Sequence, residues 1–224
     1  MTAIRTRAIV LRRTNYGEAD RILQLMTPEG KRSVMARGVR REKSKLAGGI
    51  ELFGVSDVVI NTGKGELGIL TSARLVHYYQ NIIGDYDRLQ FGYEVIKQVN
   101  AASEMVDEPE WYDVLFEVIK ALDAKTLPLQ LTQTWFYLHH ADLLGSPLSL
   151  VNDINGQALQ ADQRYMYDIS EKGLRQATNG ELTADHIKLM RLIQAKPLDV
   201  LVQVGGVAGI LPECWATARA HAAI

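Results

Sequence analysis

The chain has 224 residues, of which 47% are hydrophobic and 23% are charged, proportions that are ordinary for a globular protein. Its apolar runs fall short of the roughly 18 residues that a membrane-spanning helix requires. The N-terminal segment lacks the apolar stretch of a secretory signal, so we expect a cytoplasmic protein. The single cysteine, Cys214, excludes an internal disulfide and a cysteine-rich zinc site within one chain.

The formal net charge of −1 hides an uneven distribution along the chain. Residues 1–80 carry 14 Lys and Arg against 7 Asp and Glu, whereas residues 81–224 carry 11 against 19. The first part therefore has a net charge of +7 and the second a net charge of −8. A split of this size suggests two domains with different partners, the first favouring a polyanion.

The first 80 residues have the pattern of short strands separated by turns. Glycine, asparagine and proline mark turns at 15–17, 28–30 and 61–65. Five short strands suit a small closed barrel, because closure removes exposed sheet edges. The expected strands cover residues 8–11, 22–27, 33–36, 52–60 and 67–71.

Beyond Tyr79 the apolar residues recur at helical spacing. Thr183 is expected to cap one of these helices, with His186 three positions on. Residues 152–168 are rich in Asn, Asp, Gln and Gly, which predicts a loop or small hairpin, and Cys214 lies where a terminal helix should start. We place the domain boundary near residue 80, with an irregular insertion at about 150–170. The expected helices cover residues 89–100, 114–122, 131–144 and 181–194.

The most informative segment is a basic stretch at residues 31–45, where seven Lys and Arg are opposed only by Glu42. It leaves a predicted strand as a mobile connection, and its contacts with phosphates would be largely independent of base sequence. Tyr16 could stack on an unpaired base, and Phe53 is a second candidate, although a strand position is more typical of a core residue. The candidate DNA-binding residues are Arg12, Arg13, Tyr16, Arg21, Lys31, Arg32, Arg37, Arg40, Arg41, Lys43 and Lys45.

Several of these segments resemble the opening of the RecO family of bacterial recombination mediators. The resemblance is carried by Ala8-Ile9-Val10-Leu11-Arg12-Arg13, by residues 16–23 and 27–31, by Ala36-Arg37-Gly38-Val39-Arg40-Arg41 with residues 43–46 and 52–53, and by the turn at 63–67. It is weaker beyond residue 80, where 136–145 is similar to the family's central helix. The resemblance implies an α+β, multi-domain protein, with an N-terminal five-stranded OB-fold β-barrel at 1–80 and a mainly helical domain at 81–224.

The same resemblance implies that the protein binds single- and double-stranded DNA and anneals complementary strands. It also implies loading of the RecA recombinase onto DNA coated by single-stranded DNA-binding protein, with RecR and that coating protein as direct partners. The protein would act without catalysis or a cofactor, near the nucleoid, and its basic stretch would touch DNA. Many family members carry two Cys-x-x-Cys pairs that bind zinc, but the corresponding residues 152–156 contain no cysteine. We therefore expect a zinc-free insertion held by packing and hydrogen bonds.

Two other patterns resemble functional motifs. Residues 63–68 fit G-x-G-x-x-G, yet a strand rather than a helix is expected after them, which favours a hairpin over a dinucleotide site. His139 and His140 are adjacent, and neighbouring helical side chains point about 100° apart, so they would not converge on one metal ion. Surface or partly buried histidines are the simpler interpretation.

Three alternatives to DNA binding by the basic stretch remain open. Its cations could merely keep a loop solvated. The barrel could instead belong to an adaptor that binds an acidic protein. Glu18 and Asp20 could serve a metal-dependent nuclease as a carboxylate pair.

Overall fold

A computed structural model describes residues 2–63, 65 and 67–223. Within it the chain forms two compact units, Met1–Asp123 and Ala124–Ile224. The change from strands to helices falls between Tyr78 and Tyr86, but the first two long helices belong to the same unit as the strands. The domain boundary at residue 80 stays a prediction.

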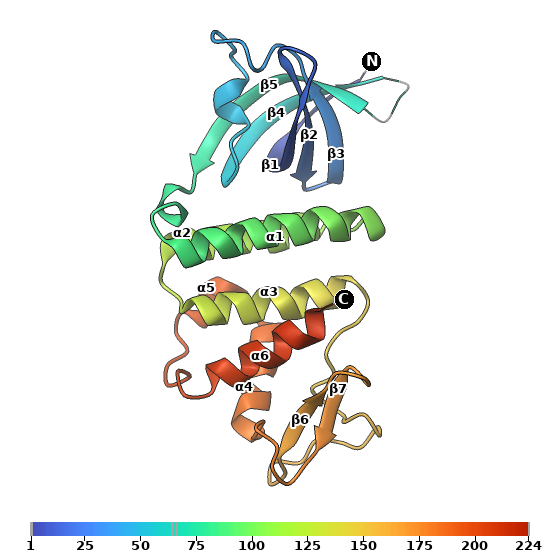
Figure 1. Cartoon of the computed structure of the whole chain (residues 1–224), viewed down its shortest axis with the longest axis vertical. Helices are drawn as coiled ribbons and strands as arrows, with labels where there is room; N and C mark the ends of the chain where they lie inside the picture. The colour runs from blue at the N-terminus through green and yellow to red at the C-terminus, as the bar shows by residue number, and fades with distance from the viewer. Residues whose placement is uncertain (1, 64, 66, 224) are drawn as a thin grey trace. The chain divides into compact units, whose positions relative to one another are not determined.

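Five strands of the first unit close into a barrel with the order β1-β2-β3-β5-β4 (Figure 1). All neighbouring pairs are antiparallel except β3 and β5, whose parallel pairing closes the barrel. The predicted α+β arrangement, with a five-stranded barrel before a mainly helical region, is confirmed. The strands are β1 (Thr2–Tyr16), β2 (Asp20–Thr27), β3 (Gly30–Ala36), β4 (Gly54–Thr62) and β5 (Leu67–Tyr78).

Strand β1 is much longer than the predicted 8–11 because its two halves have different partners. Thr2–Ile9 pairs with β4, and Ile9–Tyr16 pairs with β2. The turn at residues 61–65 joins antiparallel strands, so the hairpin interpretation of the G-x-G-x-x-G pattern at residues 63–68 is confirmed. Two residues of that pattern, Lys64 and Glu66, lie outside the described residues.

The inside of the barrel is filled by aliphatic side chains that alternate along the strands, as period-two burial requires. The short helix η1 (Ala47–Gly49) packs against β5, and its Gly49 lies so close to that strand that an added Cβ would overlap the backbone of Ala73. The core residues are Ala8, Val10, Leu23, Leu25, Val34, Ala36, Val39, Ile50, Val58, Ile60 and Leu70.

Two long helices complete the first unit, α1 (Tyr86–Met105) and α2 (Trp111–Ala124), after the short η2 (Gln80–Ile82). Helix α1 approaches the barrel closely at Gly92, where an added Cβ would lie 2.7 Å from Cε1 of Phe53. The Phe53 side chain is buried, with its ring in edge contact with Tyr93 at 5.2 Å between centroids. Phe53 is therefore a core residue and does not offer a stacking surface.

The second unit contains α3 (Leu129–Leu143), α4 (Ala184–Ala195), α5 (Leu198–Leu201) and α6 (Leu211–Ala222). Helix α3 packs against α4 and α6. The predicted cap is confirmed, because the Thr183 and His186 side chains form a reciprocal capping box at the start of α4. None of the helices in the described part of the chain combines the length and apolarity that crossing a membrane demands.

The predicted insertion is a hairpin of β6 (Tyr165–Asp168) and β7 (Gly173–Gln176), preceded by a turn around Asp153. The Asp153 carboxylate oxygen Oδ1 accepts hydrogen bonds from the backbone N–H groups of Asn155 at 2.9 Å and Gln157 at 2.8 Å. The Ile154 N–H donates to the Leu174 carbonyl at 2.9 Å and so ties this turn to β7. Hydrogen bonds therefore hold this turn in place.

Replacing Asp153 with alanine should loosen this insertion. The change removes the buried carboxylate that accepts from two backbone N–H groups, which should cost about 1–3 kcal/mol of unfolding free energy. Hydrogen exchange should show faster exchange at residues 152–157 and in β7. Asp162→Ala, an exposed position in the same insertion, is the matched control; equal exchange in the two variants would contradict this role for Asp153.

Candidate nucleic-acid interface

The turn between β1 and β2 lies against the segment that follows β3. The Gly38 N–H donates to Oδ1 of Asp20 at 2.6 Å, and the Arg40 N–H donates to the Ala19 carbonyl at 2.9 Å. The Arg40 side chain adds a bond from Nη1 to the Gly17 carbonyl at 3.2 Å. Figure 1 shows the two segments side by side at one end of the barrel. We call residues 37–45 the cationic loop.

Local hydrogen bonds order the cationic loop. Gly38 has a φ of 63°, in the left-handed region, and its carbonyl accepts from the Arg41 N–H at 3.1 Å. The Arg41 carbonyl then accepts from the Ser44 N–H at 3.0 Å. Val39 is buried in the barrel core, which anchors the loop from within. The sequence predicted a mobile connection, but turn hydrogen bonds and one apolar anchor give the segment a defined path.

Five cations of this loop are exposed. Within residues 2–63, 65 and 67–223, none of the five forms an ion pair with a carboxylate. Their positive charges are therefore available to an external polyanion. They are Arg37, Arg40, Arg41, Lys43 and Lys45.

Tyr16 lies beside this loop at the end of β1, opposite Asp20 in the strand pairing. Its side chain is 55% exposed, and among the described residues no aromatic ring contacts it. Tyr16 immediately precedes the turn residue Gly17, whose carbonyl accepts a hydrogen bond from the Arg40 guanidinium. An exposed ring next to cations can stack on a base while the cations contact phosphates.

The remaining predicted residues divide into two groups. Arg21 lies at the start of β2, where its Nε donates to Oδ1 of Asn15 at 3.1 Å, and Arg12 is exposed on β1. Arg13 is 27% exposed and pairs with Glu51 at 2.9 Å, so its charge is partly neutralised.

Lys31 and Arg32 lie at the start of β3, the far end of that strand from the cationic loop. The Lys31 side chain is 11% exposed, and its Nζ contacts the Asn100 carbonyl at 2.7 Å and Glu104 at 2.9 Å, both on α1. This pair lowers the pKa of the Glu104 carboxyl. Arg32 donates to the Glu29 carbonyl at 3.1 Å. The basic stretch of the sequence is thus divided in space, because its first two cations lie at the other end of β3 and contact groups of the protein itself.

Asp20 should act as the anchor of the cationic loop. If charge alone mattered, Asp20→Ala would raise the affinity for DNA, because it removes a negative charge near the cations. We expect the opposite, a loss of about threefold or more, because a lost hydrogen bond to a charged group, worth about 1.5–3 kcal/mol, releases the loop. Glu18→Ala in the same turn is the matched control. An affinity equal to or above that of Glu18→Ala, measured by fluorescence anisotropy, would rule out the anchoring role.

The comparisons with known proteins agree with this architecture. Residues 1–79 match the family model described as recombination protein O N terminal. A DNA repair protein RecO of Dehalococcoides mccartyi (strain 195) is 28% identical over 226 residues, which cover 97% of this chain and 88% of that relative.

The chain is similar to the RecO family, most clearly in residues 1–79.

Other RecO proteins align over shorter regions. The DNA repair protein RecO of Roseiflexus sp. (strain RS-1) is 33% identical over 142 residues, or 63% of this chain and 50% of the relative. That of Synechococcus elongatus is 35% identical over 136 residues, or 58% of this chain and 51% of the relative. The chain therefore aligns with only about half the length of these two RecO relatives.

Four of the five histidines and the cysteine lie in packed surroundings, whereas His77 is exposed. His139 stacks on Trp135 with 3.8 Å between ring centroids, while His140 is buried, and burial lowers the pKa of His140 to about 4. His186 and His221 are also buried, more deeply than the surface or partly buried positions expected for the histidines. Burial raises the pKa of the Cys214 thiol to about 12, which leaves it protonated near neutral pH. In the described part of the chain no three His, Cys, Asp or Glu side chains gather as metal ligands.

Sequence reasoning missed a second group of cations, which consists of Arg5 and Arg7 on β1 and Arg74 on β5. Arg5 and Arg7 are two residues apart on one strand and so share a face of the sheet. That spacing was visible in the sequence. Their proximity to Arg74 was not, because it depends on β1 and β5 both pairing with β4.

Proposed function

We propose that this chain acts in DNA repair and recombination by binding DNA through the cationic loop and Tyr16. One observation carries the proposal, namely five exposed cations on an ordered loop that hydrogen bonds hold against the turn bearing an exposed tyrosine. Cations that already have a defined backbone path lose little conformational entropy on binding. Contacts with phosphates make the binding largely independent of base sequence.

Annealing follows from the same chemistry. Two complementary strands repel each other through their phosphates, and bound cations reduce that repulsion while releasing counterions. Stacking on Tyr16 would engage one base and leave its neighbours free to pair. The protein would promote annealing by bringing strands together, with no covalent step. We propose that both single- and double-stranded DNA bind at this end of the barrel.

The partners form the finer part of the proposal. RecR and single-stranded DNA-binding protein would bind directly, and RecA would be loaded onto the DNA as a consequence. Residues 81–224 carry a net charge of −8, which supports a role in protein contacts rather than in phosphate binding.

A salt titration tests the DNA-binding step. If the five loop cations contact phosphates, log affinity should fall with log salt at a slope of about −3.5 for single-stranded and −4.5 for double-stranded DNA. Tight binding without salt dependence would refute the phosphate contacts. A strand-annealing assay, with and without single-stranded DNA-binding protein, tests the next step. Unchanged annealing rates on addition of the protein would refute the annealing role.

A further inference from the structure

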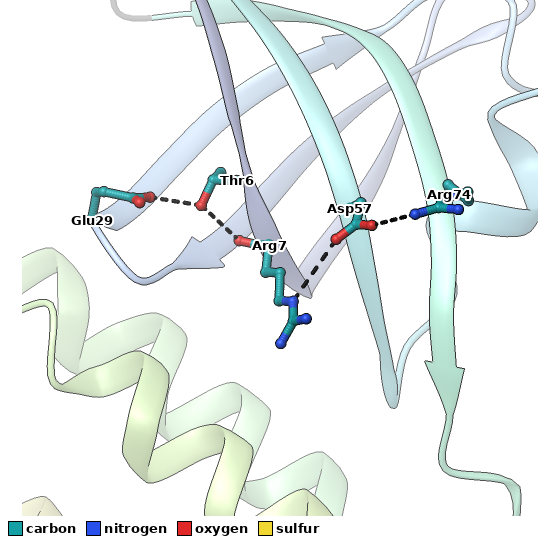
Figure 2. Close-up of polar contacts among 5 residues, drawn as sticks. All are labelled: Thr6, Arg7, Glu29, Asp57 and Arg74. Carbon is teal, nitrogen blue, oxygen red and sulfur yellow. Dashed lines mark hydrogen bonds and ion pairs between the residues drawn. The ribbon is translucent and has the colours of Figure 1, made fainter.

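The outer face of the barrel carries a row of alternating charges across three strands. Arg7 of β1 pairs in register with Asp57 of β4, which pairs in turn with Arg74 of β5. In the neighbouring row Arg5 lies opposite Val59, which lies opposite Ser72. Figure 2 shows Arg7 and Arg74 approaching the Asp57 carboxylate from its two sides.

A single carboxylate holds two guanidinium groups in this row. Arg7 Nε lies 3.8 Å from Oδ1 of Asp57, and Arg74 Nη2 lies 2.8 Å from Oδ2. The side chains of Arg7 and Arg74 are 61% and 80% exposed. An arginine has five N–H donors, so one shared carboxylate leaves most donors of both residues unused. In Figure 2 the terminal nitrogens of Arg7 point away from Asp57.

These side chains line a shallow groove of about 460 Å³. Three guanidiniums and one carboxylate give its lining a net charge of +2. Thr6, also in the lining, donates its hydroxyl to Glu29 at 2.8 Å, and this second carboxylate lies beyond Thr6. We call this feature the arginine groove; its polar lining is Arg5, Thr6, Arg7, Asp57, Ser72 and Arg74.

The arginine groove is distinct from the cationic loop. Arg7 lies nine residues before Tyr16 on the same strand, which corresponds to about 30 Å along β1. Arg5 and Arg7 are about 6.6 Å apart along the strand, so their guanidinium groups can contact different phosphates of one nucleic-acid strand. Guanidinium groups match phosphate oxygens in planar, two-point contacts. Both the spacing and the donors suit a sugar–phosphate backbone.

We propose that the arginine groove binds the phosphates of a second nucleic-acid strand while the cationic loop holds the first. This inference rests on the proposed function, because it presumes that the loop binds DNA. Two strands on one barrel would meet at an effective concentration far above their concentration in solution. Asp57 keeps Arg7 and Arg74 in place and limits the affinity of the groove, so that a second strand can leave after pairing.

Two oligothymidine strands, one carrying a donor fluorophore and one an acceptor, test the inference without any base pairing between them. Energy transfer on the wild-type protein reports two strands on one particle. The groove variant is Arg5→Gln/Arg7→Gln/Arg74→Gln. Its affinity for the first strand should stay within about twofold of that of a charge-matched control. Its affinity for the second strand should be at least tenfold weaker. The control is Lys97→Gln/Lys172→Gln/Lys188→Gln, three exposed positions outside the groove. Its energy transfer should match that of the wild type.

Asp57→Asn gives a test of opposite sign. It removes the one negative charge of the lining and should tighten capture of the second strand severalfold. Wild-type protein that binds only one strand, or a triple groove variant that still captures two, would overturn the inference and leave the proposed function intact. Competitors can be compared at equal concentrations of negative charge. If polyglutamate or inorganic phosphate displaced the second strand where unlabelled oligothymidine did not, the inference would also be overturned. Absence of any strand binding by the wild type would instead refute the proposed function.

Discussion

Replacing Arg37, Arg40 and Arg41 with alanine should weaken binding of single-stranded DNA on the order of 50-fold at 0.15 M salt. Each phosphate contact contributes about 0.7 to the slope of log affinity against log salt, so three lost contacts should lower that slope by about 2.1. Such contacts contribute little at 1 M salt. Extrapolating the difference in slope from 1 M to 0.15 M salt therefore gives a loss of affinity on the order of 50-fold. The three side chains are exposed and lack ion-pair partners among the described residues, so their removal should leave the barrel intact. The Arg40 variant loses its surface bond to the Gly17 carbonyl but keeps the backbone bond from Arg40 to Ala19.

Fluorescence anisotropy at several salt concentrations measures both quantities. The Lys97→Gln/Lys172→Gln/Lys188→Gln variant is the control, because it removes the same charge from positions outside the loop. A smaller slope in the loop variant alone would support direct phosphate contacts. An unchanged affinity, together with loss of binding to a protein partner, would favour the adaptor that the sequence left open.

Gly49→Ala should destabilise the barrel by about 2–3 kcal/mol. The new Cβ would overlap the carbonyl of Ala73, and its contact with the Ala73 Cβ would be 2.7 Å. Because backbone atoms cannot move aside as a flexible side chain can, η1 must shift away from β5 at the typical cost of an overpacked core. For a unit of this size, the melting temperature should fall by roughly 10 °C.

The neighbouring residue supplies the control for this experiment. Gly48 is exposed, and an added Cβ there would meet no atom within 4 Å. Gly48→Ala should therefore melt within about 2 °C of the wild type. Thermal unfolding followed by circular dichroism compares the two variants, and equal melting temperatures would contradict the close contact between η1 and β5.

The barrel could be predicted because its strands obey simple local rules. Apolar residues alternate in β2 and β3, and glycine or proline marks the turns between strands. The first half of β1 escaped prediction because residues 2–7 are mostly polar and exposed. Only the pairing with β4, about fifty residues further along the chain, shows that this segment is a strand.

The sequence could predict the part of the candidate interface whose residues are close together both along the chain and in space. The cations of residues 37–45 stay together because they share one loop. Lys31 leaves the set because its partner Glu104 is 73 residues away, a contact that no local pattern reveals. The placement of Asp20 beneath Gly38 is likewise a tertiary contact, and it gives a structural task to a carboxylate that the sequence offered as a catalytic candidate.

The close approach of α1 to the barrel sets a lower limit on the piece of this protein that can be produced alone. A fragment ending at residue 79, where the family model stops, would strip the ring of Phe53 of its contacts with Gly92 and Tyr93 and leave Lys31 without its helix acceptors. Such a fragment would expose an aromatic side chain that is 2% exposed in the whole protein. The shortest fragment that folds alone and keeps the cationic loop should therefore run through Asp123. Truncation experiments that aim to separate the barrel from the rest of the chain should keep α1 and α2 in the fragment.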